Sequence, residues 1–251
     1  MEQKILNRLI KHYERAIAHY GEAAVLGVFL YGSQNYGTNT ENSDVDTKCI
    51  LVPNLFHLAI KPYEVKHLHI DEEVCECMSI MHMVANWKKQ NINFVEILFT
   101  DYCIINPLYQ EVWSTWLTVA NKESIARYDI KAAVLSMSHQ AIHTMKQDPT
   151  DLKKIMNGAR IANSLTKLVT EPYVSYKEVI RANETVAKIR IGETPVPAGF
   201  VDGLIIFFES MIKCANEGEY DSDPKMRATT EMFLNDVILE IISERIERIG
   251  G

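Results

Sequence analysis

The sequence has no long apolar run. A helix needs roughly 20 consecutive apolar residues to cross a bilayer, and the longest run in the C-terminal half of this 251-residue chain is 204–208. Residues 1–17 mix charged and apolar side chains, which is typical of an amphipathic helix and not of a signal peptide. We therefore expect a cytoplasmic protein without a membrane partner.

Cysteine is also scarce, with five residues and no pattern of pairs. Cys75 and Cys77 are separated by one residue, whereas zinc sites usually place two residues between two cysteines and add a second pair. An odd number of cysteines without a disulfide framework indicates reduced thiols inside a cell. Buried strand positions are the simpler interpretation of this pair.

Positive charge is in short supply. The chain has 26 lysines and arginines against 33 aspartates and glutamates, which gives a formal net charge of −7. General nucleic-acid binders usually carry a basic face and a high isoelectric point, so this class is disfavoured, although a local basic channel is compatible with the total. Hydrophobic residues make up 47% of the chain, which is enough for a sizeable core in one large or two small domains.

The chain lacks the G-x-x-x-x-G-K-[ST] motif, so a P-loop is not expected. It has instead a Gly32-Ser33 turn after the apolar run 24–31, followed downstream by two acids, Asp44 and Asp46. On a strand, residues i and i+2 lie on one face, and two carboxylates on one face can hold two divalent ions about 3.5–4 Å apart. The N–H groups of the turn and the serine hydroxyl can bind phosphate. The pattern indicates metal-dependent transfer of a nucleotidyl group.

These residues resemble the hallmark of the nucleotidyltransferase superfamily that includes DNA polymerase beta, in which Gly-Ser is followed by acid-apolar-acid on a strand. Residues 31–33 and 44–46 carry the hallmark, and the segment 87–100 (WKKQNINFVEILFT) is similar to a phage and bacterial branch of the superfamily. The resemblance covers residues 25–110. It implies transfer of NMP from ATP or another NTP to an acceptor hydroxyl, with pyrophosphate released and Mg2+ or Mn2+ as the cofactor. A phage-encoded member would act in the host cytoplasm.

The resemblance also implies a third acid on a neighbouring strand, and alignment with the similar branch places it at Glu76. Glu76 would share a face with Val74 and Met78, where a carboxylate needs a partner or a metal because burying an unpaired charge is costly. The branch usually has Asp at this position, and Glu is longer by one methylene. Together with Asp44 and Asp46, Glu76 is expected to ligate the metal and to act in catalysis. The competing positions for the third acid are Asp71, Glu72, Glu73 and Glu96.

Three basic residues are candidates for nucleotide binding beside the Gly-Ser turn. Lys48 lies two residues after Asp46 and would share its face of an ideal strand, where it would balance the acids or contact a phosphate. Lys153 and Arg160 are seven positions apart, nearly two helical turns, so both can point the same way. The similar branch has Lys and Arg at this spacing, but it has proline where this chain has Leu152, and it often has two histidines between them.

The pattern of apolar residues changes near residue 105: short apolar runs come before it, and long helical patterns separated by prolines follow it. We predict an α+β fold, with a nucleotidyltransferase-type mixed sheet and flanking helices in residues 1–110 and a helical domain in residues 111–251. The boundary is expected within 105–128, and segment 92–99 fits either a helix or a strand. The predicted strands are 24–31, 44–52 and segments of 67–78; the predicted helices are 3–20, 54–60, 79–90, 107–120, 129–147, 151–170, 175–190, 198–217 and 228–249.

The acceptor stays open at this level: a small molecule, an RNA end or a protein side chain would each offer a hydroxyl. The apolar stripe of the predicted helix 228–249 would pack on its own domain or form a homodimer contact. A different class of function is a non-catalytic module that binds a nucleotide, RNA or protein partner on the same kind of fold. A further enzyme class is a synthase of signalling oligonucleotides. Release of pyrophosphate would separate an enzyme from a binding module.

Overall fold

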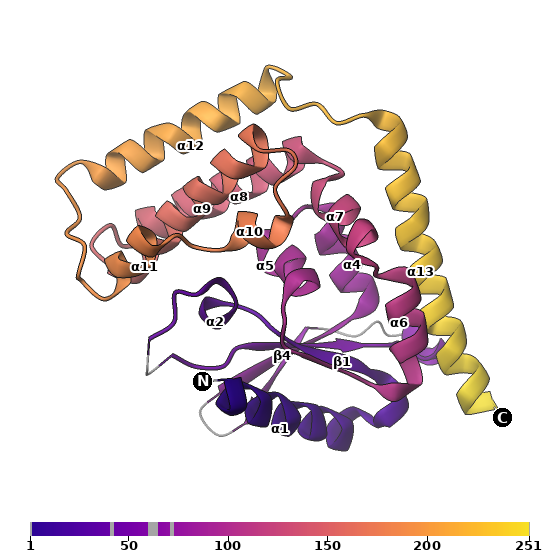
Figure 1. The fold of residues 1–251 in the computed structure, drawn as a ribbon. Helices are drawn as coiled ribbons and strands as arrows, with labels where there is room; N and C mark the ends of the chain where they lie inside the picture. Colours follow the sequence, from indigo (N-terminus) through magenta and orange to yellow (C-terminus); the bar gives the residue numbers. More distant parts are fainter. Residues whose placement is uncertain (1, 41–42, 60–64, 71–72, 251) are drawn as a thin grey trace.

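A computed structural model describes residues 2–40, 43–59, 65–70 and 73–250, which form an α+β structure around one five-stranded sheet (Figure 1). The strand order is β3-β4-β2-β1-β5. β2 runs parallel to β4 and the other neighbouring strands are antiparallel, so the predicted α+β class with a mixed sheet is confirmed. The strands are β1 (Val25–Leu30), β2 (Thr47–Leu51), β3 (Lys66–Ile70), β4 (Glu73–Ser79) and β5 (Cys103–Ile105).

Both faces of the sheet are covered, because its central strands are apolar on both sides. Helix α1 (Glu2–Tyr20) packs on one face, where Leu9 and Val28 belong to the same hydrophobic cluster (Figure 1). The other face carries Phe29 and Ile50, which share a second cluster with residues of later helices such as Trp87 and Trp113. Alternate residues of a strand point to opposite faces, which explains why the first strand reads as a continuous apolar run. The predicted first helix and first strand are both observed.

The second strand is shorter than predicted. β2 begins at Thr47, so Asp44 and Asp46 lie in the segment that leads into the strand and not on the strand itself. Hydrogen bonds between Thr40 and Ser43 precede them: the Ser43 N–H donates to the Thr40 carbonyl at 3.0 Å, and the Ser43 hydroxyl accepts from the Thr40 N–H at 2.8 Å. Polar residues of this kind favour turns because their side chains bond to nearby backbone, and here that preference outweighs the apolar run that follows.

The chain after β4 is mostly helical. The ambiguous segment 92–99 is helical, and the helix predicted over 175–190 is two short helices, because Asn183 begins the second by accepting from the Val186 N–H at 2.9 Å. Strand β5 and helix α7 are additional to the predicted elements. The helices are α2 (Ser33–Tyr36), α3 (Leu55–Ala59), α4 (Ile80–Lys88), α5 (Ile92–Val95), α6 (Gln110–Trp116), α7 (Val119–Arg127), α8 (Ile130–Gln147), α9 (Leu152–Thr170), α10 (Tyr176–Ile180), α11 (Glu184–Arg190), α12 (Phe200–Asn216) and α13 (Pro224–Gly250), with 3-10 helices η1 (Glu22–Ala24), η2 (Glu96–Phe99) and η3 (Pro107–Tyr109).

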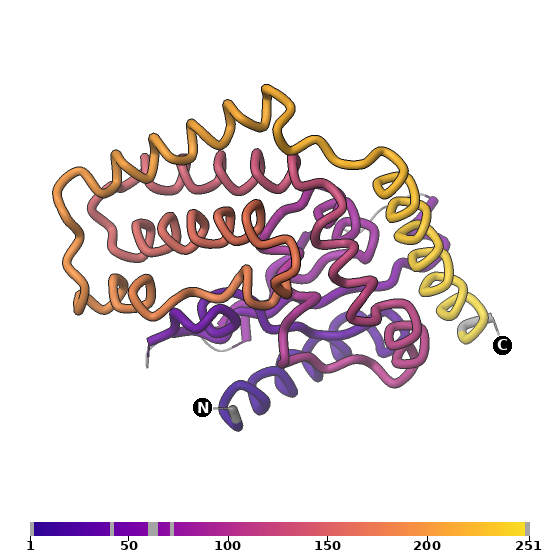
Figure 2. The backbone as a smooth tube through the Cα atoms, turned by 45° about the horizontal axis from the view of Figure 1, so that its top comes forward, coloured from indigo at the N-terminus to yellow at the C-terminus, as the bar shows by residue number. Residues whose placement is uncertain are grey.

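The C-terminal helix, α13, returns to the N-terminal half of the chain. It runs along the side of the molecule and packs against α4 and α6 (Figures 1 and 2). The Asn235 side chain accepts from Lys88 at 3.1 Å, and Arg245 donates to the carbonyl of Val52. Leu234, Val237 and Ile241 of this helix belong to the main hydrophobic cluster, so its apolar side packs on its own chain. A homodimer contact stays a prediction.

One hydrophobic cluster extends from the sheet through the helices on both sides of the predicted domain boundary, with Leu98, Trp113 and Met137 among its members. The division within 105–128 stays a prediction. No helix in the described part of the chain combines the length and the apolar character that a membrane crossing needs.

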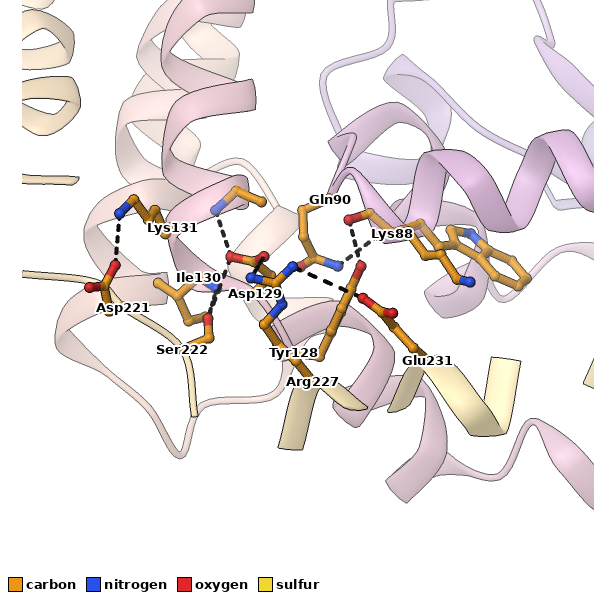
Figure 3. A network of polar contacts seen from close by, with 12 residues as sticks. Lys88, Gln90, Tyr128, Asp129, Ile130, Lys131, Asp221, Ser222, Arg227 and Glu231 are labelled. Carbon is orange, nitrogen blue, oxygen red and sulfur yellow. Dashed lines mark hydrogen bonds and ion pairs between the residues drawn. The ribbon is translucent and has the colours of Figure 1, made fainter. Parts of the chain in front are cut away.

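A polar network ties the start of α8 to the segment that leads into α13 (Figure 3). Asp129 caps α8 by accepting from the Ala132 N–H at 2.9 Å, and it pairs with Arg227 at 3.3 Å. The Ser222 hydroxyl donates to Asp129 at 3.4 Å and accepts from the Ile130 N–H at 3.2 Å. Capping and charge pairing at a helix N-terminus both stabilise it, so this network gives the C-terminal segment a structural part in the fold.

Candidate functional site

The Gly-Ser turn lies at the end of β1, as the sequence predicts. Gly32 has a φ of 80°, in the left-handed region, and Ser33 begins the short helix α2. A Cβ atom on Gly32 would lie 3.0 Å from Oδ2 of Asp46. Both the backbone conformation and this close approach require glycine. The turn and the second acid of the pair are therefore in direct proximity.

Asp44 and Asp46 flank Val45, which is fully buried, while Asp44 is exposed and Asp46 is half-buried. The Tyr31 N–H donates to the Asp46 carbonyl at 3.1 Å, which holds the segment beside the turn. Burial raises the pKa of the Asp46 carboxyl, the Asp44 charge raises it further, and Lys153 opposes the rise. The two carboxylates thus lie close enough to repel each other, and a lysine of the helical half faces them.

A cavity of about 470 Å³ opens beside these residues. The turn contributes Gly32 and Ser33 to its lining, and the segment before β2 contributes Asp46. Helices α8, α9 and α11 contribute most of the remaining wall, with mostly polar side chains. This volume is of the size that protein sites for small ligands occupy. Its lining includes Tyr31, Tyr36, Thr38, Asn93, Gln140, Thr144, Asp151, Lys153, Lys154, Met156, Asn157 and Arg190.

The positive charge of the cavity comes from Lys153, Lys154 and Arg190. The two lysines stand in the first turn of α9, where Asp151 caps the helix by accepting from the N–H groups of both, at 2.7 and 3.4 Å. The Asp151 carboxylate offsets the partial positive charge of the helix N-terminus, so the positive charge at this end comes from the two lysine side chains. This end of the cavity is therefore suited to an anion.

Arg190 is a residue that the sequence did not reveal. It lies in the last turn of α11, and its Nη2 donates to the Ser43 hydroxyl at 3.4 Å, next to Asp44. A basic residue near a helix C-terminus is common, so its position in the chain gives no sign of a binding role. Only the packing of α11 brings it to the cavity.

Arg160 lies behind the cavity wall and not in its lining. It is 1% exposed, its guanidinium stacks over the Tyr36 ring at 3.9 Å, and its Nη2 donates to Oδ1 of Asn157 at 2.9 Å. The seven-residue spacing predicts that Arg160 and Lys153 point the same way, but only Lys153 is in the cavity lining, and Arg160 contacts the lining residues Tyr36 and Asn157. Arg160 contacts the wall and Lys153 forms part of it.

Lys48 and Glu76 form an ion pair with each other. They are register partners on β2 and β4, and the Lys48 ammonium also lies 3.9 Å from the Tyr31 ring and 4.5 Å from the Phe94 ring. Lys48 therefore supplies the charged partner that the Glu76 carboxylate needs on this apolar face. Neither residue is in the cavity lining, and within the described residues Glu76 does not form a metal-holding group with Asp44 and Asp46.

The competing acids are placed differently. Glu73 is buried on β4 and pairs with Arg8 at 3.6 Å and His12 at 3.3 Å. Asp71 and Glu72 lie outside the described residues. Within the described ranges, no group of three or more acidic, histidine or cysteine side chains is arranged to hold a metal ion. Of the two aspartates before β2, Asp46 lines the cavity, whereas Asp44 is exposed and lies outside the lining.

Glu96 lies directly behind the Gly-Ser turn. It is fully buried, and its Oε1 accepts from the Gly32 N–H at 3.3 Å. Burial raises the pKa of the Glu96 carboxyl to about 7, against the opposing effects of Arg160, the Gly32 N–H and Lys48. A carboxyl group with this pKa changes its charge near neutral pH, beside the candidate site.

Replacing Glu96 by Gln is expected to stabilise the protein at pH 8 and to have little effect near pH 4. The raised pKa means that the folded state binds the proton more tightly, so the wild type has its full stability below the ordinary value of 4.5 and loses it as the pH rises through about 7. At about 1.4 kcal/mol per pKa unit, the loss is about 3 kcal/mol. Urea unfolding at both pH values measures the effect, and the same loss in wild type and variant would contradict it.

The search for known relatives returned no match, either among models of protein families or among curated proteins. The parts of the site are a glycine turn, the Asp46 carboxylate and a basic helix N-terminus around one cavity, with Asp44 next to the cavity and outside its lining.

Proposed function

We propose that the protein is a metal-dependent nucleotidyltransferase, which moves NMP from an NTP to an acceptor hydroxyl and releases pyrophosphate. The observation that carries this proposal is a single cavity shared by the Gly32–Ser33 turn and Asp46 on one side of the chain and by Lys153 and Arg190 on the other. The acidic part suits a divalent cation, and the basic part suits the phosphates that the cation would accompany. We also propose that the five-stranded sheet is of the nucleotidyltransferase type.

Asp44 and Asp46 would hold the cation. Their donors are all oxygen, which suits Mg2+ or Mn2+. The Asp44 charge contributes to the raised pKa of Asp46, and a bound cation would relieve that repulsion. Mg2+ keeps several waters and takes only one or two carboxylates when phosphate oxygens are also present, so two aspartates are sufficient. When bound, the cation supplies charge neutralisation and lowers the pKa of the attacking hydroxyl.

The other residues position the nucleotide. Gly32 allows the chain to approach the phosphates closely, and the Ser33 hydroxyl offers a hydrogen bond. Lys153 and Lys154 act as positive charges at the start of α9, and Arg190 can bind two phosphate oxygens at once. Because most of phosphoryl transfer is positioning and charge neutralisation, these contacts make up the larger part of what the protein contributes.

The non-catalytic binding module is the second candidate, and one observation favours it. Glu76, expected as the third acid, is neutralised by Lys48 and lies outside the cavity lining. A site with two acids and a basic wall would bind a nucleotide and its cation without a further carboxylate to accept the proton. The two candidates differ in turnover and not in affinity.

The test is to incubate the protein with each labelled NTP, with Mg2+ or Mn2+, in the presence and absence of a cell extract. Pyrophosphate release together with label on a protein, RNA or small molecule would support the enzyme and identify the acceptor class. Label in oligonucleotides formed without extract would indicate a synthase of such products. Tight nucleotide binding without pyrophosphate release under every condition would favour the binding module.

Replacing Lys153 or Arg190 by Ala is expected to weaken binding of ATP in the presence of Mg2+ by about tenfold or more. Hydrogen bonds to charged groups contribute roughly 1.5–3 kcal/mol, and about 1.4 kcal/mol corresponds to tenfold in affinity. Isothermal titration calorimetry measures the change. Lys188→Ala is the matched control, because Lys188 is on the same helix as Arg190 and pairs with Glu184 at 2.6 Å. Wild-type affinity in both cavity variants would contradict the assignment.

A further inference from the structure

Two buried charges lie behind the Gly-Ser turn. Glu96 is fully buried and Arg160 is 1% exposed. Among the described residues, Oε2 of Glu96 and Nη1 of Arg160 have no hydrogen-bond partner. Burying charged groups is costly unless they are paired and bonded. Apolar side chains would fill the same space at less cost, so the residues call for an explanation beyond packing.

The contacts of Glu96 converge on the turn. Its Oε1 accepts from the Gly32 N–H at 3.3 Å, and its backbone carbonyl accepts from the Asn35 side chain at 3.5 Å. One residue of η2 therefore contacts both the start and the middle of the segment that carries Ser33. This arrangement also directs the Gly32 N–H away from the cavity, so the turn reaches a ligand through its other groups.

Arg160, on α9, lies near Glu96 and contacts residues of both halves of the chain. Its charge opposes the rise in the pKa of Glu96, so the two groups lie within electrostatic reach. Its guanidinium covers the Tyr36 ring at 3.9 Å and donates to Asn157 at 2.9 Å. Tyr36 and Asn157 both line the cavity. The charges thus link the turn, η2 and α9 at the cavity wall.

We propose that Glu96 is a positioning residue of this site: its carboxylate holds the Gly32 amide and so fixes the Gly32–Ser33 turn next to Asp46. The proposal rests on the proposed function for the identity of the ligand, an NTP, but not for the contact itself. The distance of 3.0 Å between a Cβ on Gly32 and Oδ2 of Asp46 leaves little freedom for the turn. Without the contact to Glu96, the turn would be free to move, and the Ser33 hydroxyl would no longer be fixed relative to the Asp46 carboxylate.

The ionisation of the Glu96 carboxyl depends on its burial and on the charged groups around it. The raised pKa places its ionisation near neutral pH, and an ionised acceptor bonds an N–H more strongly than a neutral one. The Gly32 amide should therefore respond to pH through Glu96. The titratable and charged groups that face Glu96 are Arg160 on α9, Lys48 on β2, Tyr31 after β1, Tyr36 on α2 and Tyr176 on α10.

The contact between Glu96 and the Gly32 N–H is tested by NMR on the full chain labelled with ¹⁵N-glycine. The chain has eleven glycines. We expect the Gly32 amide resonance of the wild type to shift with a midpoint near pH 7, and the shift to be lost in Glu96→Gln. Glu73→Gln is the matched control, because Glu73 is also buried but pairs with residues of α1; it should titrate as the wild type does. An identical Gly32 titration in wild type and Glu96→Gln would overturn the proposal. This arm does not depend on any enzyme activity.

The positioning role is tested with ATP and Mg2+ at pH 8. Glu96→Gln is expected to bind ATP about tenfold more weakly than the wild type, while Glu73→Gln binds as the wild type does. Unchanged affinity with turnover lost would overturn positioning and make Glu96 a group that acts on the reacting atoms. Unchanged affinity with unchanged turnover would also overturn it. If the wild type itself binds no NTP, the proposed function fails and the NMR result alone decides whether Glu96 holds the turn.

Discussion

Replacing Asp44 and Asp46 together by Asn should lower pyrophosphate release by at least ~100-fold, the order seen when one preorganised electrostatic contact is removed from an active site. Asn cannot supply the negative charge that holds a divalent cation. The fold should persist, because burial and the Asp44 charge both raise the pKa of Asp46, and the neutral side chain avoids that unfavourable charge at pH 8. Thermal unfolding should show an equal or higher midpoint.

The matched control is Asp101→Asn with Asp221→Asn, which changes the formal charge by the same amount. Asp101 pairs with Lys177 and Asp221 pairs with Lys131 on the surface, away from the cavity lining (Figure 3 for Asp221). This variant should keep full activity. Pyrophosphate release at the wild-type rate in the Asp44 and Asp46 variant, with Mg2+ present, would rule out the metal mechanism and leave the binding module.

The second large effect is expected at Gly27, in the middle of β1. A Cβ atom there would lie 2.6 Å from the carbonyl oxygen of Ile104 and 3.2 Å from Cα of Ile105 on β5. Both obstacles are backbone atoms of a neighbouring strand, so relief requires the strands to separate. Gly27→Ala should therefore lower the free energy of unfolding by about 3 kcal/mol, the upper part of the range for overpacked sites.

Gly203→Ala is the control for this substitution. Gly203 lies in α12, and a Cβ atom there meets nothing within 4 Å. Alanine is the better helix former, so this variant should gain roughly 0.5–1 kcal/mol. Chemical unfolding followed by circular dichroism measures both variants. Equal stability of Gly27→Ala and wild type would mean that β5 does not pack against β1 as the structure has it.

Local patterns in the sequence were sufficient for several features. The apolar periodicity of α1 and the apolar run of β1 predict their elements correctly, because helix and strand periods are read from neighbouring residues. The α+β class follows from the change in the pattern of apolar residues near residue 105. Gly32 at the end of β1 is also a local feature, since a turn after a buried strand demands a residue that tolerates positive φ.

Elements whose limits depend on competing local signals were predicted less well. The strand predicted to start at Asp44 begins at Thr47, and the Ser43 side chain just before this segment bonds to the Thr40 backbone. The capping side chain of Asn183 divides a predicted helix into α10 and α11. In both cases a polar side chain that bonds to the backbone decided the boundary.

The sequence by itself determined which residues could serve the site: the glycine turn, the aspartate pair and the lysine at the start of α9. The tertiary structure decided which of them meet. It placed Arg190 beside Ser43 across 147 positions of chain, paired Lys48 with Glu76, and put Glu96 behind Gly32. The physical reason is that burial, ion pairing and the resulting pKa shifts depend on neighbours from distant segments. The spacing of residues along the sequence does not show which distant residues those neighbours are.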